Sequence, residues 1–273
     1  MSYKTLIVHL DGSRQCDDRI RFALRLGQAH AAHVIGLYAI YEPILPITEF
    51  SWGGGLHEYL AQHQQARREG FLALAQQYGL KVEWRACHVV DPVDLTTHLR
   101  HADLLIAGQR DPADFGGLAP DDFMTDLMFG SARPVLMLPT TGTFATPARH
   151  VAIAWDASRC AARAVADAMP ILLDAAYVTV INICRPDRRK MPEPQLADFA
   201  AYLDAHRVRA HITQIECAPG MSMGNTLLEQ LASSDANMLV MGAYAHSRMR
   251  EIALGGVTRT VLKSMALPVL LSH

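Results

Sequence analysis

The fold of this protein is indicated most clearly by Leu239-Val-Met-Gly-Ala-Tyr-Ala-His-Ser-Arg-Met-Arg-Glu-Ile-Ala-Leu-Gly-Gly-Val-Thr-Arg-Thr-Val-Leu262, which is followed by Pro268-Val-Leu-Leu271. The pattern predicts a buried strand, a loop that opens at Gly242, a glycine pair at Gly255 and Gly256, a helix and a final strand. Glycines before a helix let the backbone approach an anion, and the free N–H groups of the first helical turn point at that anion. The stretch therefore indicates an α/β fold with a site suited to a nucleotide phosphate.

The same order of segments occurs twice along the chain. The first half opens with Thr5-Leu-Ile-Val-His-Leu-Asp11-Gly-Ser13, and the second with Val151-Ala-Ile-Ala-Trp-Asp156-Ala-Ser158. Each is predicted to be an apolar strand that ends in Asp, followed by a Ser that can cap the next helix. Two later landmarks recur at one offset of 134 residues: Gly108 and Gly242, and Pro134 and Pro268. We therefore predict an internal repeat.

A length of 273 residues suits two domains of roughly 130–140 residues each. The stretch Pro139-Thr-Thr-Gly-Thr-Phe-Ala-Thr-Pro147 has the composition of a linker, so we predict one domain over residues 1–140 and a second over 148–273. In each half, short apolar strands alternate with helical segments, which predicts two tandem, doubly wound α/β domains with parallel sheets. The predicted helices are Arg14–His30, Leu56–Tyr78, Val93–His101, Ala161–Leu173, Pro194–His206, Thr226–Ser233 and Thr258–Met265.

Composition and charge exclude several classes of function. Half of the residues are hydrophobic, 19% are charged and the net charge is −2, so nothing indicates binding to nucleic acid or to an anionic membrane. The apolar runs are shorter than the ~20 residues that span a bilayer, and the N-terminal residues do not resemble a signal peptide. The five cysteines are odd in number and lack CxxC spacing, which predicts reduced thiols in a cytoplasmic protein.

These residues resemble the universal stress protein family in its tandem two-domain form. The resemblance rests on the two Asp-x-Ser strand ends, on the Gly242 to Gly255 loop and on the terminal Pro-Val-Leu strands. It implies a Rossmann-like, adenine nucleotide alpha hydrolase-like fold. ATP-binding members of the family carry a loop similar to Gly-x-x-Gly-x9-Gly-Ser/Thr. In them the Asp after the first strand lies at the adenosine, and the glycine loop lies at the phosphates. The resemblance also implies a pseudo-dimer within the chain through the closing strands, a possible homodimer, and a role in the stress response with a partner protein of unknown identity.

The second half matches the ATP-binding pattern at Asp156, Gly242 and Gly255 but departs from it at two positions. Ala245 stands where the second glycine belongs, and its methyl group disfavours positive φ. Gly256 lacks the expected hydroxyl but keeps its N–H, and the hydroxyl of Thr258 could replace it. The candidate site for ATP or ADP with Mg²⁺ comprises Ala154, Asp156, Gly242, Ala245, His246, Arg248, Gly255, Gly256, Val257 and Thr258. Arg248 either neutralises phosphate charge or is an ordinary solvated arginine.

The first half departs further from the pattern, because Asp121 and Asp122 align with Gly255 and Gly256. Two carboxylates would repel a polyphosphate, or would themselves contact a helix N-terminus. We therefore expect that the first half does not bind phosphate. Gly130-Ser131 is predicted to be the C-terminal cap of the helix that precedes Pro134.

Other kinds of site find less support in the sequence. Pairs such as His30/His33 and His98/His101 lack acidic or cysteine partners at ligand spacing, so we predict surface histidines and no metal site. Cys16 and Cys160 are expected to face helix–sheet packing. No catalytic residue is evident, so any ATPase activity would be weak. Three functions stay open: a nucleotide-binding signalling module, a scaffold that acts through its surface, and an ATP-using enzyme of the wider nucleotide-binding α/β superfamily.

Overall fold

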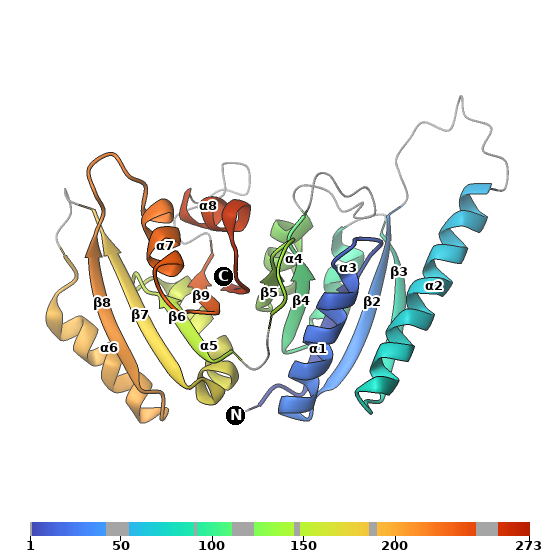
Figure 1. Ribbon diagram of the computed structural model, residues 1–273, viewed down its shortest axis with the longest axis horizontal. Helices are drawn as coiled ribbons and strands as arrows, with labels where there is room; N and C mark the ends of the chain where they lie inside the picture. The colour runs from blue at the N-terminus through green and yellow to red at the C-terminus, as the bar shows by residue number, and fades with distance from the viewer. Residues whose placement is uncertain are drawn as a thin grey trace. The chain divides into compact units, whose positions relative to one another are not determined.

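A computed structural model describes residues 2–41, 55–89, 92–110, 123–144, 148–185, 190–243 and 256–273. The chain divides into two compact units, Ser2–Arg133 and Pro134–His273. Each unit is described by itself below (Figure 1).

The first unit is a parallel sheet with helices on both faces. Its strand order is β3-β2-β1-β4, and each neighbouring pair is parallel. Helix α1 contacts α2, and α3 contacts α4. The elements, in chain order, are β1 (Thr5–Leu10), α1 (Cys16–His30), β2 (His33–Tyr41), α2 (Gly55–Gln77), β3 (Val82–Val89), α3 (Pro92–Leu99), β4 (Leu104–Gly108) and α4 (Phe123–Ser131).

The second unit has the strand order β5-β10-β9-β6-β7-β8. All neighbouring strands are parallel except β5 and β10, which pair antiparallel with Leu136 opposite Leu270. The elements are β5 (Val135–Leu138), β6 (His150–Ala154), α5 (Arg159–Asp174), β7 (Tyr177–Cys184), α6 (Glu193–Ala205), β8 (Ala210–Glu216), α7 (Met223–Ala232), β9 (Met238–Gly242), α8 (Gly256–Ser264) and β10 (Val269–Ser272). Strand β5, which the predicted limits assign to the first domain, belongs to this unit.

The central strands form the core because they are apolar on both faces. Almost every residue of β1, β4, β9 and β10 is buried, as expected for parallel strands covered by helices on either side. Helix α5 turns a stripe of small and apolar residues inward and contacts β6, β9 and β10. The predicted doubly wound α/β fold is confirmed.

Three local predictions need correction. Strands β3 and β8 were not predicted, because apolar and polar residues mix along both, as is common where one face of a strand is partly exposed. Helix α4 ends at Ser131, and the residue that follows, Ala132, has the left-handed conformation (φ 54°), so Gly130 lies inside the helix and is not its cap. His30 is buried and its ring meets Tyr3 edge-on at 5.1 Å, so it is not a surface histidine.

Candidate functional site

In the second unit, the candidate site begins where β6 ends. Ala154 is the last residue of β6, and the exposed Asp156 follows two residues later. The Asp156 carboxylate accepts a hydrogen bond from the N–H of Ser158 (2.9 Å). The Ser158 hydroxyl in turn accepts from the N–H of Ala161 (3.1 Å) and caps α5, as predicted. Asp156 is therefore held at the start of a helix with its carboxylate open to solvent.

Gly242 lies at the end of β9, beside β6. Ala154 pairs with Met241, so Gly242 stands one residue beyond this pair at the carboxyl edge of the sheet. A Cβ atom at Gly242 would collide with the backbone of Cys160 and Ala161 in the first turn of α5. Only glycine permits this close approach of helix and strand. We call Ala154, Asp156, Gly242 and the start of α8 the Asp156 site.

Trp155 lies between Ala154 and Asp156 and forms an aromatic stack away from the strand. Its ring is parallel to that of Phe199 on α6, with centroids 3.7 Å apart and an interplanar angle of 1°. The backbone N–H of Trp155 donates to the carbonyl of Ile181, and the backbone carbonyl of Trp155 accepts from the side-chain amide of Asn182. These contacts fix the backbone that presents Asp156.

Helix α8 begins at Gly256, where the glycine pair was predicted to open a helix. A Cβ atom at Gly256 would meet no described atom within 4 Å, so there is room at this end of α8. Thr258 is 3% exposed, so its side chain is shielded from solvent. The backbone N–H groups of Gly256 and Val257 are therefore the candidate donors at the start of α8. Helix α8 packs on α7, where Thr260 lies against Gly224.

Several predicted residues fall outside the described part of the chain. They are Ala245, His246, Arg248 and Gly255 in the second half, and Asp121 and Asp122 in the first. Their roles stay predictions.

The corresponding place in the first unit is filled by a buried arginine. Arg19 on α1 is 2% exposed, and its guanidinium forms an ion pair with Asp11 (2.7 Å). Its Nε donates to the carbonyl of His9 (2.7 Å), and the position of a Cβ atom at Gly108 overlaps its guanidinium. We call Asp11, Ser13, Arg19 and Gly108 the Asp11 site. An arginine occupies this site from within the chain.

Charge and burial together set the protonation of this group. Burial would raise the pKa of Asp11, but the charge of Arg19 and the hydrogen bonds from Ser13 outweigh it and hold the pKa well below its usual range. Burial lowers the pKa of His9 to about 4; Asp11 opposes this shift and Arg19 adds to it. The site is therefore an ionised Asp–Arg pair beside a neutral histidine.

Two expectations about the first unit change as a result. Ser13 does not cap α1; its hydroxyl and N–H both donate to Asp11 (2.5 and 3.0 Å), and the residue before α1 is Gln15, which makes no side-chain cap. The role of Arg19 was missed altogether. The available signal was the arginine eight residues after Asp11, where the second half has Ala164.

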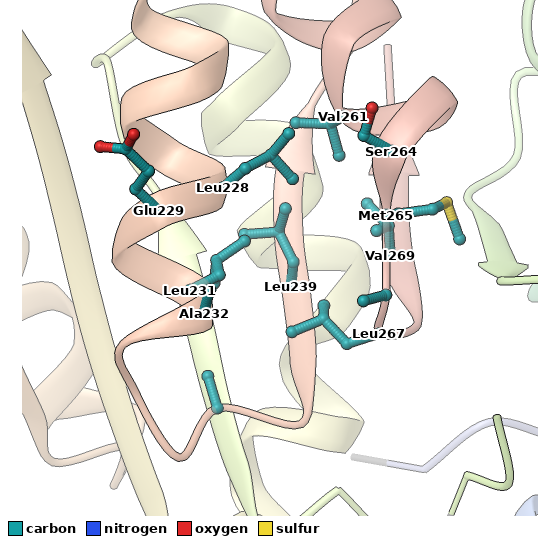
Figure 2. A pocket seen from close by; sticks show the side chains of 12 residues that line it. Leu228, Glu229, Leu231, Ala232, Leu239, Val261, Ser264, Met265, Leu267 and Val269 are labelled. Carbon is teal, nitrogen blue, oxygen red and sulfur yellow. The ribbon is translucent and has the colours of Figure 1, made fainter. Parts of the chain in front are cut away.

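Two hollows among the described residues of the second unit lie at the amino ends of strands, away from the Asp156 site. One has a volume of about 480 Å³ and is lined mainly by apolar side chains of α7, α8 and the starts of β9 and β10. Figure 2 shows Leu228 and Val261 directed toward each other near Leu239, with Glu229 directed away. The other is polar and is considered below.

The comparison with protein families identifies the second half. Residues 147–273 match the model of the universal stress protein family. The chain carries a universal stress protein domain. This match spans Asp156, Gly242 and Gly256, the residues around which the candidate site is built.

Solved structures show that the fold extends over the whole chain. A universal stress protein from Archaeoglobus fulgidus matches with a TM-score of 0.74 and 16% identity, over 98% of this chain and 97% of that one. A functionally unknown protein from Pseudomonas aeruginosa matches with a TM-score of 0.59 and 16% identity, over 99% and 92%. Comparison with curated proteins gave no match.

The described residues also bear on other kinds of site. None of their helices is long and apolar enough to cross a membrane. They contain no group of three or more His, Cys, Asp or Glu placed to hold a metal ion. All five cysteines are buried and free, and burial raises the pKa of both Cys16 and Cys160, which disfavours their thiolates at neutral pH.

Proposed function

We propose that the protein is a regulatory stress-response protein whose universal stress protein domain binds ATP or ADP, with Mg²⁺, at the Asp156 site. The observation that carries the proposal is the exposed carboxylate of Asp156 at the carboxyl edge of the sheet. Open parallel sheets bind ligands at this edge. Asp156 would accept hydrogen bonds from the ribose, and the N–H groups at the start of α8 would face the phosphates. The described residues of this site include no evident general base, and we expect any hydrolysis to be slow.

One nucleotide would bind per chain, because Arg19 already neutralises Asp11 in the first unit. We further propose a cytoplasmic location, which the five free cysteines support. We also propose that the two domains form a pseudo-dimer within the chain and that the protein acts on a partner protein.

The experiment is a calorimetric titration of the full chain with Mg-ATP. We expect saturable binding with a 1:1 stoichiometry below millimolar concentration. The Asp156→Asn variant should bind at least tenfold more weakly, since a hydrogen bond to a charged group is lost from an exposed position that the fold does not need. The matched control is Asp204→Asn, another exposed aspartate, which should bind like the unmodified chain.

Two further variants address the departures from the family pattern. Gly256→Ser restores the expected hydroxyl at a position with room for it and should strengthen binding several-fold. Ala245→Gly removes the methyl group in the loop. Absence of binding at millimolar Mg-ATP would overturn the proposal in favour of a scaffold that acts through its surface; recovery in Ala245→Gly would then trace the loss to that methyl group.

A further inference from the structure

A second, polar groove lies in the same unit at the amino ends of β6, β7 and β8. Its volume is about 770 Å³, within the range of small-molecule sites. The residues that matter for its chemistry are Arg149, His150, Tyr177, Arg209, His211 and Asp235. We call it the Tyr177 groove. His150, which lines the groove, is the first residue of β6, and Asp156 follows the last residue of that strand. The Tyr177 groove and the Asp156 site therefore lie at the amino and carboxyl ends of the strands, respectively.

The strand register places the two arginines on either side of Tyr177. His150 on β6 pairs with Tyr177 on β7, and Val178 pairs with Ala210 on β8. Arg149 and Arg209 directly precede His150 and Ala210. Since neighbouring strands lie ~4.8 Å apart, the two arginine backbones stand about 10 Å apart across β7. Arg209 is level with Tyr177, whereas Arg149 is level with Ala176. Both arginines lie just before their strands and line the same groove, so their long side chains can reach one ligand group.

The charge of the groove is positive although the chain as a whole is slightly negative. Arg149 and Arg209 are both exposed, and neither forms an ion pair with any described residue. Asp235 is the one acidic side chain of its lining. Unpaired guanidinium groups bind phosphate through parallel hydrogen bonds in a fixed geometry.

Hydrogen bonds fix the backbone from which the lining side chains extend. The Arg149 carbonyl accepts from the N–H groups of both Ala176 and Tyr177 (3.0 and 3.1 Å). His150 and Asn237 are joined twice, through His150 N to Asn237 Oδ1 (3.1 Å) and Asn237 N to His150 O (2.9 Å). Because this backbone is already ordered, binding a ligand would cost the conformational entropy of side chains and little of the backbone.

Tyr177 supplies a flat apolar surface in the middle of this polar lining. It is 62% exposed, and the ring of His150 meets it at 67° with centroids 6.2 Å apart. An exposed aromatic ring between two cations suits a planar ring attached to a phosphate, because the ring can stack while the phosphate is paired.

We propose that the Tyr177 groove binds a small organic phosphate that carries a planar ring. Arg149 and Arg209 hold the phosphate, and Tyr177 stacks on the ring. The site is independent of the Asp156 site and does not require nucleotide to bind there.

The experiment uses three probes and a chain that carries Asp156→Asn, which weakens any binding at the Asp156 site at least tenfold. AMP carries both phosphate and ring, ribose 5-phosphate carries the phosphate alone, and adenosine carries the ring alone. Calorimetry should rank them in that order, with AMP about tenfold tighter than ribose 5-phosphate because of the stacking on Tyr177.

Substitutions then separate the two contacts. Arg149→Gln and Arg209→Gln should each weaken AMP and ribose 5-phosphate about tenfold, whereas Tyr177→Leu should weaken AMP alone, to the level of ribose 5-phosphate. Arg68→Gln, which removes an exposed arginine of α2, is the matched control and should change neither. The proposal is overturned if ribose 5-phosphate fails to bind at millimolar concentration, or if Arg149→Gln/Arg209→Gln binds both probes unchanged. Mg-ATP binding to Arg149→Gln/Arg209→Gln with Asp156 intact tests the Asp156 site separately.

Discussion

The Asp11 and Asp156 sites start from the same local sequence and end in opposite states. Both aspartates follow an apolar strand and accept a hydrogen bond from the N–H of the serine two residues later. The Asp11 side chain is 15% exposed and paired with Arg19, whereas Asp156 is exposed. The difference comes from the residue eight positions on, Arg19 in one unit and Ala164 in the other.

The size of that residue also sets how close the helix lies to the next strand. The Arg19 guanidinium fills the space beside Gly108, while Ala164 leaves α5 free to approach Gly242 until their backbones are in contact. One side chain on the helix thus decides whether the carboxylate at the strand end belongs to a buried ion pair or stays available to a ligand.

The largest effect should come from breaking the buried ion pair. Arg19→Met removes the guanidinium but keeps most of the apolar stem, and leaves the Asp11 charge buried without its partner. We expect a loss of about 3–5 kcal/mol in the free energy of unfolding, measured by urea denaturation. Arg163→Met is the control: Arg163 is about half exposed and pairs with Asp167 on the surface, so its loss should be below ~1 kcal/mol. Equal losses in the two variants would contradict a difference between the buried and the exposed ion pair.

The next effect is a dependence of stability on pH that comes from His9, beside the Asp11 site. Burial lowers the pKa of His9 to about 4 from its usual 6.5, so between these values the unfolded chain binds a proton that the folded chain does not. Stability from this group is full above pH 6.5 and falls as the pH drops toward 4, by up to about 3 kcal/mol. His9→Gln should remove this part of the slope in denaturation at pH 7, 5.5 and 4.5, and the exposed His211→Gln should not.

Asp11 adds a second dependence of stability on pH, in a more acidic range. Its pKa is depressed in the folded state, so its contribution to stability is present above the pKa of an unfolded aspartate and is lost as the pH falls below about 4.

The His9 prediction has a clear contradicting outcome. A His9→Gln chain that still lost stability between pH 6.5 and 4 as steeply as the unmodified chain would show that the pH dependence comes from another group.

The smallest effect concerns the two serines. Ser158→Ala should cost about 1 kcal/mol, because the cap on Ala161 is lost, and Ser158→Asp should recover most of it. Ser13 caps nothing and acts through Asp11, whose pKa is held well below its usual range. The cost of Ser13→Ala should therefore still be present at pH 4 and should diminish only at lower pH, as the Asp11 carboxylate of the folded chain becomes protonated, while the cost of Ser158→Ala persists. Parallel pH profiles for the two variants would contradict this distinction.

The sequence predicts the fold well because its strongest signals are local. Apolar strands such as β1 and β9, and glycines and prolines at their ends, mark the order of elements without reference to contacts. The edge strands β3 and β8 escaped prediction because their mixed patterns depend on which face is covered. The pairing of Arg19 with Asp11 escaped it for a related reason: the pattern does not show which side of α1 faces the strand end. Gly242 was predicted to meet a phosphate, and its observed neighbour is the backbone of α5.

The stacked ring of Trp155 makes the second unit optically distinct. The chain has three tryptophans, at positions 52, 84 and 155, so Trp155 is the sole indole of residues 134–273. Its backbone adjoins Asp156, and its ring lies flat against Phe199. With Trp52 and Trp84 replaced by phenylalanine, the emission of the remaining indole would register events at the end of β6 alone. The protein thus contains its own fluorescent reporter, placed beside the residue whose occupancy is in question.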